Sequence, residues 1–258
     1  MSTLRIEFLG TGTSQGVPVI ACRCEVCTSG DPRDKRLRSS VLAEAQGKRL
    51  LIDAGPDMRQ QLLRADVRDL DAVLLTHEHM DHIAGIDDLR AFNFAQQRAM
   101  PIHSSAATLA AVEQVFHYAF APDKYPGVPE LQLQPIPGPV FSAAGVEVHT
   151  IDVMHMHMPV LGFRIGGFAY ITDAKRIAPE VVTQLRGVHT LVLNALRRKE
   201  HPSHLNLEQA LALVEHIAPH RAYFTHISHL LGTHAEVSAE LPAGVQLAHD
   251  GLVLEVPA

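Results

Sequence analysis

Apolar residues along this chain gather in short runs that are separated by polar and glycine-containing turns. Runs of about four to eight aliphatic and aromatic residues between such turns are typical of buried β-strands. They predict strands over residues 5–9, 41–45, 49–53, 72–76, 146–153, 162–165, 168–172, 190–194, 222–225 and 252–256. Gly166 and Gly167 stand between two of these runs and indicate a hairpin turn.

A second set of segments carries its apolar residues at helical spacing. It predicts helices over residues 56–64, 87–97, 106–119, 179–186, 206–217 and 234–240. In the fifth of these, Asn206 is suited to cap the N-terminus, and the apolar face consists of Leu207, Ala210, Leu211 and Val214. Hairpins and helices spread through both halves favour sheets covered by helices over an all-parallel sheet. Residues 121–140 contain six prolines and little periodicity, so we expect a surface loop or lid there.

Composition places the chain among globular α/β proteins. Its 258 residues and 47% hydrophobic content are enough for one large core, and no repeat or linker divides it, so we predict a single domain over residues 1–258. The net charge of −6 argues against nucleic acid or an anionic membrane as a partner, because both favour a basic excess. The 17 histidines are in excess, which agrees with a metalloenzyme.

The N-terminal residues run directly into a predicted strand and show no pattern of a secretion signal. No apolar run approaches the roughly 20 residues that cross a bilayer. We therefore expect a cytoplasmic protein without a membrane partner.

Directly after the predicted strand at residues 72–76, four metal-ligating side chains stand within six positions, namely His77, His79, Asp81 and His82. The end of a strand can deliver side chains into a pocket without burying the chain that carries them. Imidazole and carboxylate groups are the ligands that zinc, manganese and iron prefer. The alternative is a polar loop whose histidines stand together by coincidence, and the density of ligands argues against it.

Further ligand-type residues stand just past three other predicted strands: His155, Asp173 and His226. A lone His or Asp at such a place is more often a turn or cap residue, but four placements of the same kind make coincidence a poor explanation. Two metals about 3.5–4 Å apart can clamp a phosphoryl or acyl oxygen. We therefore predict a two-metal site, with His77 and His79 serving one metal and Asp81 and His82 the other.

All three cysteines fall within six residues, as Cys22, Cys24 and Cys27. An odd number is awkward for disulfides, and a reducing compartment disfavours them. The spacing suits one metal better, and a tetrahedral zinc would take its fourth ligand from a distant histidine. The alternative is three ordinary free thiols.

The run T-H-x-H-x-D-H at residues 76–82, with a later His, Asp and His at strand ends, resembles the metallo-β-lactamase-fold hydrolases over essentially the whole chain. The resemblance implies a mixed α/β fold, a four-layer αββα sandwich with the metals at its edge. It also matches Asp53, in the turn at residues 51–55, to an aspartate that supports the metal loop from behind.

Within that superfamily the chain resembles the PhnP-like phosphoribosyl cyclic phosphate phosphodiesterases. The shared segments are residues 9–12 (LGTG), 15–18 (QGVP), the cysteine spacing and residues 225–229 (THISH). This resemblance implies that Cys22, Cys24 and Cys27 hold a structural zinc together with His229, while His226 binds the catalytic metal.

The same resemblance selects His204 as the group that protonates the leaving oxygen. A phosphodiester expels an alkoxide, a poor leaving group, and a histidine with a pKa of about 6.5 can protonate it in the transition state. His201 is a weaker alternative for this role, and the plainer interpretation of His204 is a loop residue beside a helix start. One departure stands out: His155 and His157 both lie where the family uses one histidine, and we favour His155.

Two basic clusters are candidates for binding phosphate. One comprises Arg33, Lys35, Arg36 and Arg38, and the other comprises Arg197, Arg198 and Lys199. A run of charges is more often a solvated face.

The resulting hypothesis is a dinuclear metal-dependent phosphodiesterase that acts on a small cyclic, ribose-type phosphodiester through a metal-bound hydroxide. His77, His79 and His155 would hold one zinc or manganese ion, and Asp81, His82 and His226 the other, with Asp173 as the bridge. We expect Asp81 and His204 to take part in catalysis. The oligomeric state is open, although a homodimer fits the resemblance.

The alternatives are a carboxylic-ester, thioester or lactam hydrolase on the same fold, a tRNA-processing nuclease, and a metal-binding module without turnover.

Overall fold

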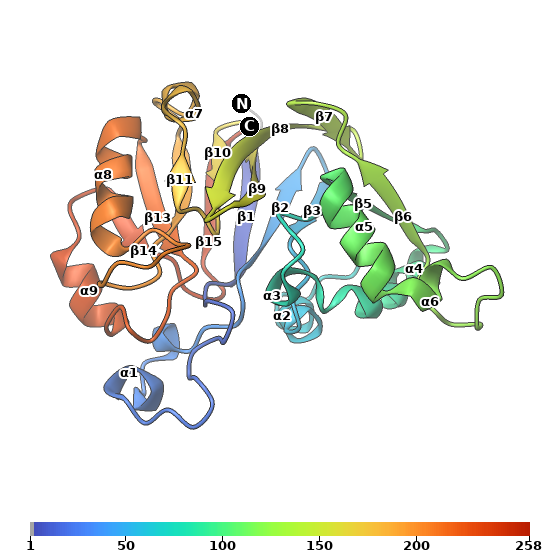
Figure 1. Ribbon diagram of the computed structural model, residues 1–258, viewed down its shortest axis with the longest axis horizontal. Coiled ribbons are helices and arrows are strands. Elements are labelled where there is room, and N and C mark those ends of the chain that lie inside the picture. The colour runs from blue at the N-terminus through green and yellow to red at the C-terminus, as the bar shows by residue number, and fades with distance from the viewer. Residues whose placement is uncertain (1–2) are drawn as a thin grey trace.

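Two β-sheets packed face to face form the centre of the computed structural model, which describes residues 3–258 (Figure 1). The first sheet has seven strands within these residues. In spatial order they are β15 (Val253–Pro257), β1 (Thr3–Gly10), β2 (Ser40–Ala45), β3 (Lys48–Ile52), β4 (Ala72–Leu74), β5 (Met100–Ser104) and β6 (Leu131–Pro135). Pairing is antiparallel from β15 to β3 and parallel from β3 to β6.

The second sheet has eight strands in the described part of the chain. Their order is β11 (Arg176–Ile177), β8 (Val146–His155), β9 (Met158–Ile165), β10 (Phe168–Tyr170), β12 (Thr190–Asn194), β13 (Arg221–Thr225) and β14 (Val245–Leu247), with β7 (Val140–Ala143) paired to β8. The glycine pair at residues 166–167 forms the predicted hairpin turn between β9 and β10.

The main core fills the space between the two sheets. Alternate residues of β1, such as Leu4, Ile6 and Phe8, point into it and meet Phe163 and Tyr170 of the second sheet. Because side chains alternate along a strand, the neighbouring positions face outward and need a second cover.

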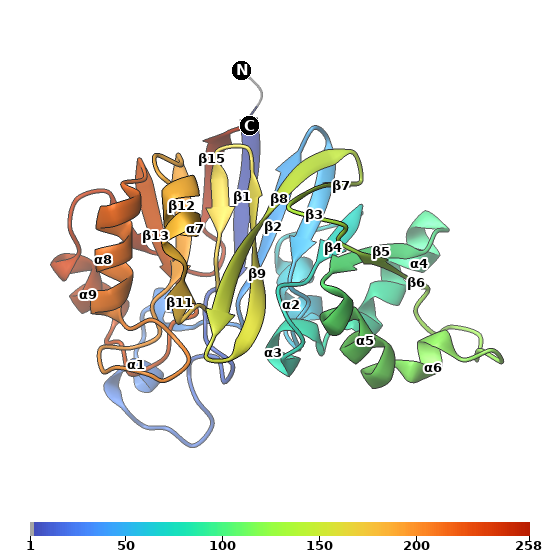
Figure 2. The ribbon, with the colours of Figure 1, turned by 45° about the horizontal axis from the view of Figure 1, so that its top comes forward.

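Helices provide that cover on both outer faces (Figure 2). The first sheet packs against α2 (Met58–Arg64), α4 (Arg90–Gln96), α5 (Ala106–Val115) and α6 (His117–Phe120). The second packs against α7 (Pro179–Gln184), α8 (Leu207–Ile217) and α9 (His234–Glu240). The predicted mixed α/β fold with four αββα layers is therefore confirmed.

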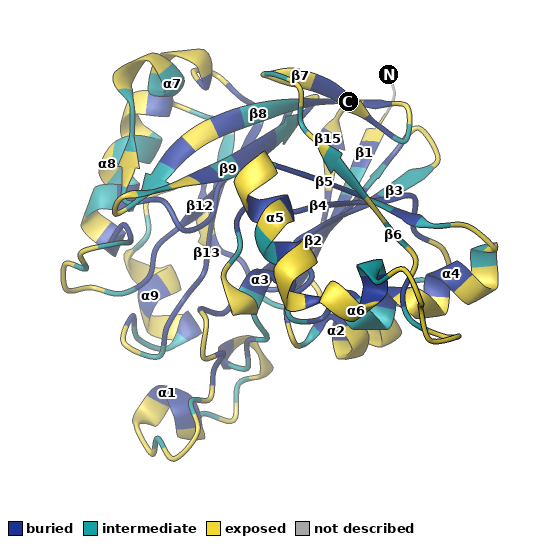
Figure 3. Cartoon of the chain, turned by 45° about the vertical axis from the view of Figure 1, so that its right-hand side comes forward, coloured by how far each residue is buried: buried dark blue, intermediate teal, exposed yellow. Residues whose placement is uncertain are grey.

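Two one-turn helices lie in loops: α1 (Glu25–Thr28) and α3 (Met80–Ile83). Two 3₁₀ turns, η1 (Pro32–Asp34) and η2 (Ile86–Leu89), follow them in the chain. The segment around α1 stands away from both sheets and is mostly exposed (Figure 3).

The prediction of a loop or lid at residues 121–140 is wrong in part. This stretch contains β6, which pairs in parallel with β5 at the sheet edge. Its residues are only partly buried or exposed, so the strand lacks the apolar run by which buried strands are found. The predicted helix at residues 106–119 is also interrupted, at Phe116.

Within residues 3–258, none of the helices combines the length and the apolar character that crossing a membrane requires.

Candidate metal centres

The histidine loop lies where β4 leaves the first sheet. The chain passes through His77 and His79 and then turns into α3, which carries Asp81 and His82. His77 Nε2 and His79 Nδ1 are 3.1 Å apart. Two nitrogens bound to one zinc at about 2.0–2.1 Å in tetrahedral geometry lie roughly 3.3 Å apart, so these two atoms are spaced as ligands of a common ion.

Buried hydrogen bonds to the Nδ1 atoms fix the orientation of the His77 and His82 rings. The Thr76 hydroxyl donates to Asp53 at 3.0 Å, which leaves its oxygen to accept from His77 Nδ1 at 2.9 Å. Asp53 also accepts from His82 Nδ1 at 2.7 Å. With their Nδ1 atoms engaged in this way, both imidazoles present Nε2 to the site, an arrangement typical of metal-binding histidines.

His82 carries the most direct sign of a cation. Its Nε2 is fully buried and has no hydrogen-bond partner among the described residues. It lies 3.1 Å from Asp81 Oδ2 and 3.3 Å from Asp173 Oδ2. A lone pair that faces two carboxylates in a buried site is unfavourable unless a positive charge lies between them, so the donor set fits a metal ion.

Asp173 stands in the middle of the cluster. Its Oδ2 is 3.2 Å from His226 Nδ1, and its Oδ1 is 3.0 Å from His204 Nε2. The ligand atoms form three overlapping groups, and within each group they lie no more than 4.8 Å from one another. The groups are His77, His82 and Asp173; Asp81, His82 and His226; and His155, Asp173 and His204. Asp173 and His82 each belong to two of them, and of these two only the carboxylate of Asp173 has two oxygens with which to bridge a pair of ions.

The structure brings His155 to the cluster and leaves His157 outside it. The ring of His155 lies 5.2 Å from that of His79, and its Nδ1 donates to the backbone oxygen of Asp173 at 3.0 Å. His157 is exposed in the turn between β8 and β9. We call the set His77, His79, Asp81, His82, His155, Asp173 and His226 the histidine centre.

Charges in the histidine centre depend on one another. Burial opposes a charge on His82, but the carboxylates of Asp53, Asp173 and Asp81 raise the pKa of its imidazole well above the ordinary value. Burial also opposes ionisation of Asp173, whereas His226 and His82 hold the pKa of its carboxyl well below the usual range. Burial lowers the pKa of His226 to about 4. Asp173 is thus charged and His226 is neutral, as metal ligands must be, and the positive charge that the three carboxylates favour at His82 is the charge that a bound ion would supply in its place.

Three residues of this region adopt left-handed backbone. Asp53, Asp173 and His226 have φ values of 63°, 56° and 55°. Asp and His enter this region more readily than most residues, although at a cost in energy. Each follows a strand of the core. The sharp turns direct the side chains of Asp173 and His226 into the histidine centre and that of Asp53 to Thr76 and His82 Nδ1.

His204 lies beside the histidine centre, in the loop before α8. It is buried, with a ring 4.5 Å from His155 and 5.0 Å from His226. Its Nε2 points to Asp173. The residue selected for proton donation therefore reaches the carboxylate at the middle of the cluster.

The three cysteines and His229 form a second group, the cysteine centre. The sulfurs of Cys22 and Cys24 are each 3.3 Å from His229 Nδ1, and that of Cys27 is 3.6 Å away. A tetrahedral zinc with Zn–S of about 2.3 Å and Zn–N of about 2.0 Å puts sulfur and nitrogen roughly 3.5 Å apart. A hydrogen bond from the backbone N–H of Cys27, and then His229, lower the pKa of the Cys24 thiol to about 6, which favours the thiolate that zinc binds. Burial raises the pKa of the Cys27 thiol to about 11, so the thiolate of Cys27 would depend on the bound cation.

A short segment connects the two centres. His226 and His229 are three residues apart after β13, and Ile227 between them exchanges backbone hydrogen bonds with Thr11 and Thr13. The Thr13 hydroxyl also lies 3.2 Å from His226 Nε2. The N-terminal loop that carries the cysteines is thereby joined to a residue of the histidine centre.

Sequence reasoning gave no role to Asn194 or Thr13. The buried Asn194 accepts from Ala174 N at 2.8 Å and donates to Ala174 O at 3.0 Å, which fixes the turn that carries Asp173. Asn194 ends a predicted strand, so the strand-end rule could have found it. Thr13 meets His226 across 213 positions of sequence, and no local pattern signals that contact.

Most members of the basic clusters are used within the protein. Arg36 is buried and donates to Thr11 and to Ala248 O, while Arg38 pairs with Asp57. Arg198 pairs with Glu240, and Arg197 donates to the backbone of Glu200. These contacts favour the plainer interpretation of both clusters as structural or surface charges.

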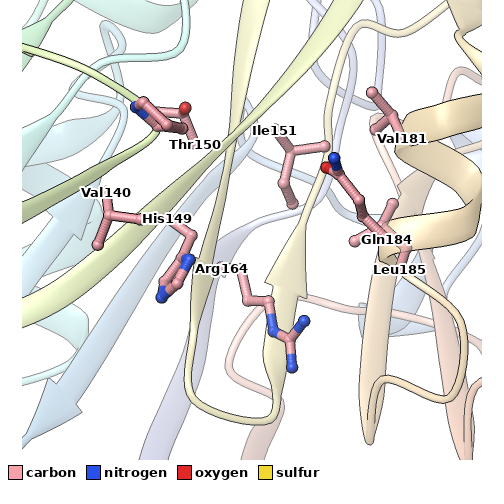
Figure 4. Close-up of a pocket in the computed structure, with 9 residues that line it drawn as sticks. Val140, His149, Thr150, Ile151, Arg164, Val181, Gln184 and Leu185 are labelled. Atoms are coloured by element: carbon pink, nitrogen blue, oxygen red, sulfur yellow. The ribbon is translucent and has the colours of Figure 1, made fainter.

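A hollow of about 290 Å³ lies between β8, β9 and α7 (Figure 4). Its lining includes His149, Thr150 and Arg164 as well as Val181 and Leu185. Residues of the two centres do not contribute to that lining, so the hollow is separate from the candidate metal chemistry.

Comparison with known proteins agrees with this geometry. Residues 48–227 match the family model of the β-lactamase superfamily domain. The chain therefore belongs to the metallo-β-lactamase superfamily. A crystal structure described as a new diphosphatase from the PhnP family is 39% identical, with a TM-score of 0.93, over 99% of this chain and 98% of that one. Within the superfamily, the chain is accordingly a member of the PhnP family.

Two further relatives carry names that indicate other activities than that of the diphosphatase. An octanoyltransferase of Porphyromonas gingivalis is 42% identical over 252 residues, which are 96% of this chain and 51% of that protein. The chain thus spans about half the length of that curated relative. The zinc-bound PqqB of Methylobacterium extorquens, at 23% identity and a TM-score of 0.81 over 98% of this chain and 100% of that one, shares the fold.

Proposed function

We propose that this protein is a dinuclear metal-dependent phosphodiesterase that hydrolyses a small cyclic, ribose-type phosphodiester. The observation that carries the proposal is the position of His204, whose Nε2 lies 3.0 Å from Asp173 Oδ1. A carboxylic ester or thioester can be cleaved on this fold without a proton donor there. A proton donor speeds the reaction most when the leaving group is an alkoxide that departs from phosphorus.

The histidine centre supplies the ligands for two ions. His77, His79 and His155 would hold one zinc or manganese ion, Asp81, His82 and His226 the other, and Asp173 would bridge them. Two such cations, when bound, would supply Lewis acidity to the phosphoryl oxygens and lower the pKa of water toward neutrality. His204 holds a proton at Nε2 and delivers it to the leaving oxygen as the P–O bond breaks.

A second candidate is the hydrolysis of a diphosphate bond, which is favoured by the PhnP-family diphosphatase of 39% identity. The leaving group is then a phosphate, a much weaker base than an alkoxide. Its departure needs little help from an acid, so dependence on His204 separates the two candidates.

The first experiment is a substrate panel for the metal-loaded protein. It compares a 2′,3′-cyclic nucleotide, an aryl phosphodiester, a dinucleoside diphosphate, a short RNA and an octanoyl thioester. We expect the cyclic phosphodiester to give the highest kcat/KM. A preference for the diphosphate would favour the second candidate, and turnover of the thioester or RNA alone would contradict both.

The paired variant is His204→Ala, with the exposed His216 of α8 changed to Ala as the control. We expect His204→Ala to lower kcat on the cyclic substrate by about 10²–10⁴-fold, the usual contribution of general acid catalysis. The aryl phosphodiester, whose phenolate leaves easily, should lose far less. Equal losses on both substrates would remove the role assigned to His204.

Metal analysis tests the ligand sets. Both centres together predict about three ions per chain, and a Cys24→Ser variant should lose one of them. A count near two in the unmodified protein would contradict zinc at the cysteine centre. The cytoplasmic location, the homodimer and the lack of a nucleic-acid partner stay predictions from the sequence.

A further inference from the structure

The Nδ1 edge of His204 faces a small polar group formed by His201 and Ser203. His204 Nδ1 lies 3.2 Å from His201 Nδ1 and 3.0 Å from the Ser203 hydroxyl. The Ser203 hydroxyl is itself 3.2 Å from His201 Nδ1. These three side chains therefore form one connected set on the side of the ring that faces away from Asp173.

The direction of these hydrogen bonds can be assigned. The backbone N–H of Ser203 donates to His201 Nδ1 at 3.3 Å, so this nitrogen carries a lone pair and the proton of a neutral His201 stands on Nε2. His201 Nδ1 is thus an acceptor that the Ser203 backbone N–H and His204 Nδ1 can share, and the Ser203 hydroxyl, 3.0 Å from His204 Nδ1, is a second acceptor on the same side. His204 can donate there while its other nitrogen points to the histidine centre.

Backbone geometry keeps this set rigid. Pro202, between the two histidines, fixes its own φ and restricts His201 to extended backbone. Leu205 N donates to Ala174 O at 2.8 Å, next to Asp173, and Asn206 donates to Arg198 O at 3.1 Å. The loop at residues 196–206 is therefore tied to the turn that carries Asp173 and to the start of α8.

A further ion pair anchors the loop from outside. Lys175 Nζ lies 3.1 Å from Glu200 Oε1 and 3.1 Å from Gln209 Oε1. Gln209 also closes the capping box of α8 with Asn206. His201 follows Glu200 directly, so this ion pair lies next to it in the chain.

We infer that His201 is a positioning residue for His204: its Nδ1 accepts from His204 Nδ1 and so directs Nε2 at the leaving oxygen. This inference rests on the proposed function and extends it by one residue. In the proton transfer, the Nε2–H bond of His204 breaks, an O–H bond forms on the departing oxygen, and the electron pair of the P–O bond goes to that oxygen. His204 keeps its other proton on Nδ1, and His201 Nδ1 continues to accept a hydrogen bond from that N–H.

The test compares His201→Ala with His201→Asn. The amide oxygen of asparagine can occupy the place of Nδ1 and accept the same hydrogen bond, whereas alanine cannot. We expect His201→Ala to lower kcat on the 2′,3′-cyclic nucleotide by about 10- to 100-fold, the scale of a misplaced catalytic group, with KM changed by less than about twofold. His201→Asn should recover most of kcat, and the aryl phosphodiester should be cleaved at nearly the normal rate by both.

Three outcomes would overturn the inference. They are unchanged kcat in His201→Ala, an equal loss on the cyclic and aryl substrates, and a further loss when His201→Ala is added to His204→Ala. His216→Ala serves as the matched control, and thermal unfolding of each variant shows whether it is folded.

A spectroscopic readout separates this inference from the proposed function. In protein with ¹⁵N-labelled histidine, the Nδ1 resonance of His204 should show a protonated, hydrogen-bonded nitrogen in the wild type and in His201→Asn. It should lose that signature in His201→Ala. This result does not require turnover: an inactive wild type would refute the proposed function, while an unchanged His204 signal in His201→Ala would refute the role of His201.

Discussion

Asp53 shows how one buried side chain can organise a site that it does not enter. It is fully buried and accepts hydrogen bonds from Thr76 and His82. Burial raises the pKa of its carboxyl, although His82 works in the opposite direction. The aspartate thus fixes the orientation of two imidazoles, directly for His82 and through Thr76 for His77.

The substitution Asp53→Asn keeps the shape and removes the charge. We expect metal affinity at the histidine centre to fall about 10- to 100-fold, as is usual when the partner of a ligating histidine is lost. Titration with a competing chelator measures the change, and the exposed Asp66→Asn is the control. Unchanged affinity would mean that Asp53 contributes only to folding.

At the scale of elements, the metal loop depends on how closely the turn after β3 approaches α3. Ala54 N donates to His82 O at 2.8 Å, and Gly85 N donates to Ala54 O at 2.8 Å. A Cβ on Gly55 would lie 2.0 Å from the backbone oxygen of Asp81. Only glycine lets these two segments meet, because a backbone oxygen cannot move aside as a flexible side chain can.

The substitution Gly55→Ala should therefore push α3 away from the turn. We expect the free energy of unfolding to fall by about 1–3 kcal/mol, the usual cost of overpacking, and the metal content of the histidine centre to fall with it. Urea unfolding and metal analysis give the two values. Gly138→Ala is the matched control, because a Cβ there meets nothing within 4 Å, and an equal loss in that variant would contradict the explanation.

The strands and helices that sequence predicted best are those with a buried apolar face. The predicted strand at residues 190–194 coincides with β12 and the predicted helix at 234–240 with α9. The strand β5 was missed although it is mostly buried, because Pro101 and His103 interrupt its apolar pattern. Four-residue helices such as α3 are too short to show periodicity.

The sequence predicted those residues of the candidate site that directly follow an apolar strand. That rule found His155, Asp173 and His226, which the structure brings together. It could not find Thr13 or the contact between His204 and His201, because these depend on the path of loops. Sequence distance carries no information about such contacts until the fold is known.

At the scale of the whole molecule, Arg36 joins regions that are distant in the chain. It is buried, and its guanidinium donates to Thr11, to the backbone oxygen of Ala248 and to His234 Nδ1 of α9, the last at 3.2 Å. Burial, and then Arg36, lower the pKa of His234 to about 4. The folded protein therefore holds His234 neutral, while the unfolded chain protonates it near its ordinary pKa of about 6.5.

This difference predicts a loss of stability in acid. Between about pH 6.5 and 4 the unfolded chain binds the extra proton, so the free energy of unfolding falls as the pH falls through that range. From pH 7 to 5 we expect His234 to account for about 1–2 kcal/mol of the loss. Urea unfolding of the wild type and His234→Gln in the same zinc-saturated buffer measures this share, because protonation of metal ligands is common to both. Parallel losses in the two proteins would contradict it.

The cysteine centre also has a topological consequence. Cys22 and His229 are 207 positions apart in the chain, so a zinc coordinated by both would close a ring that contains most of the protein. In the unfolded state such a closure, if it behaves like a disulfide, removes conformational entropy worth about 5 kcal/mol. The same ion would connect the beginning of the chain to its last third, so a zinc at the cysteine centre would stabilise the whole fold as well as the segment next to the histidine centre.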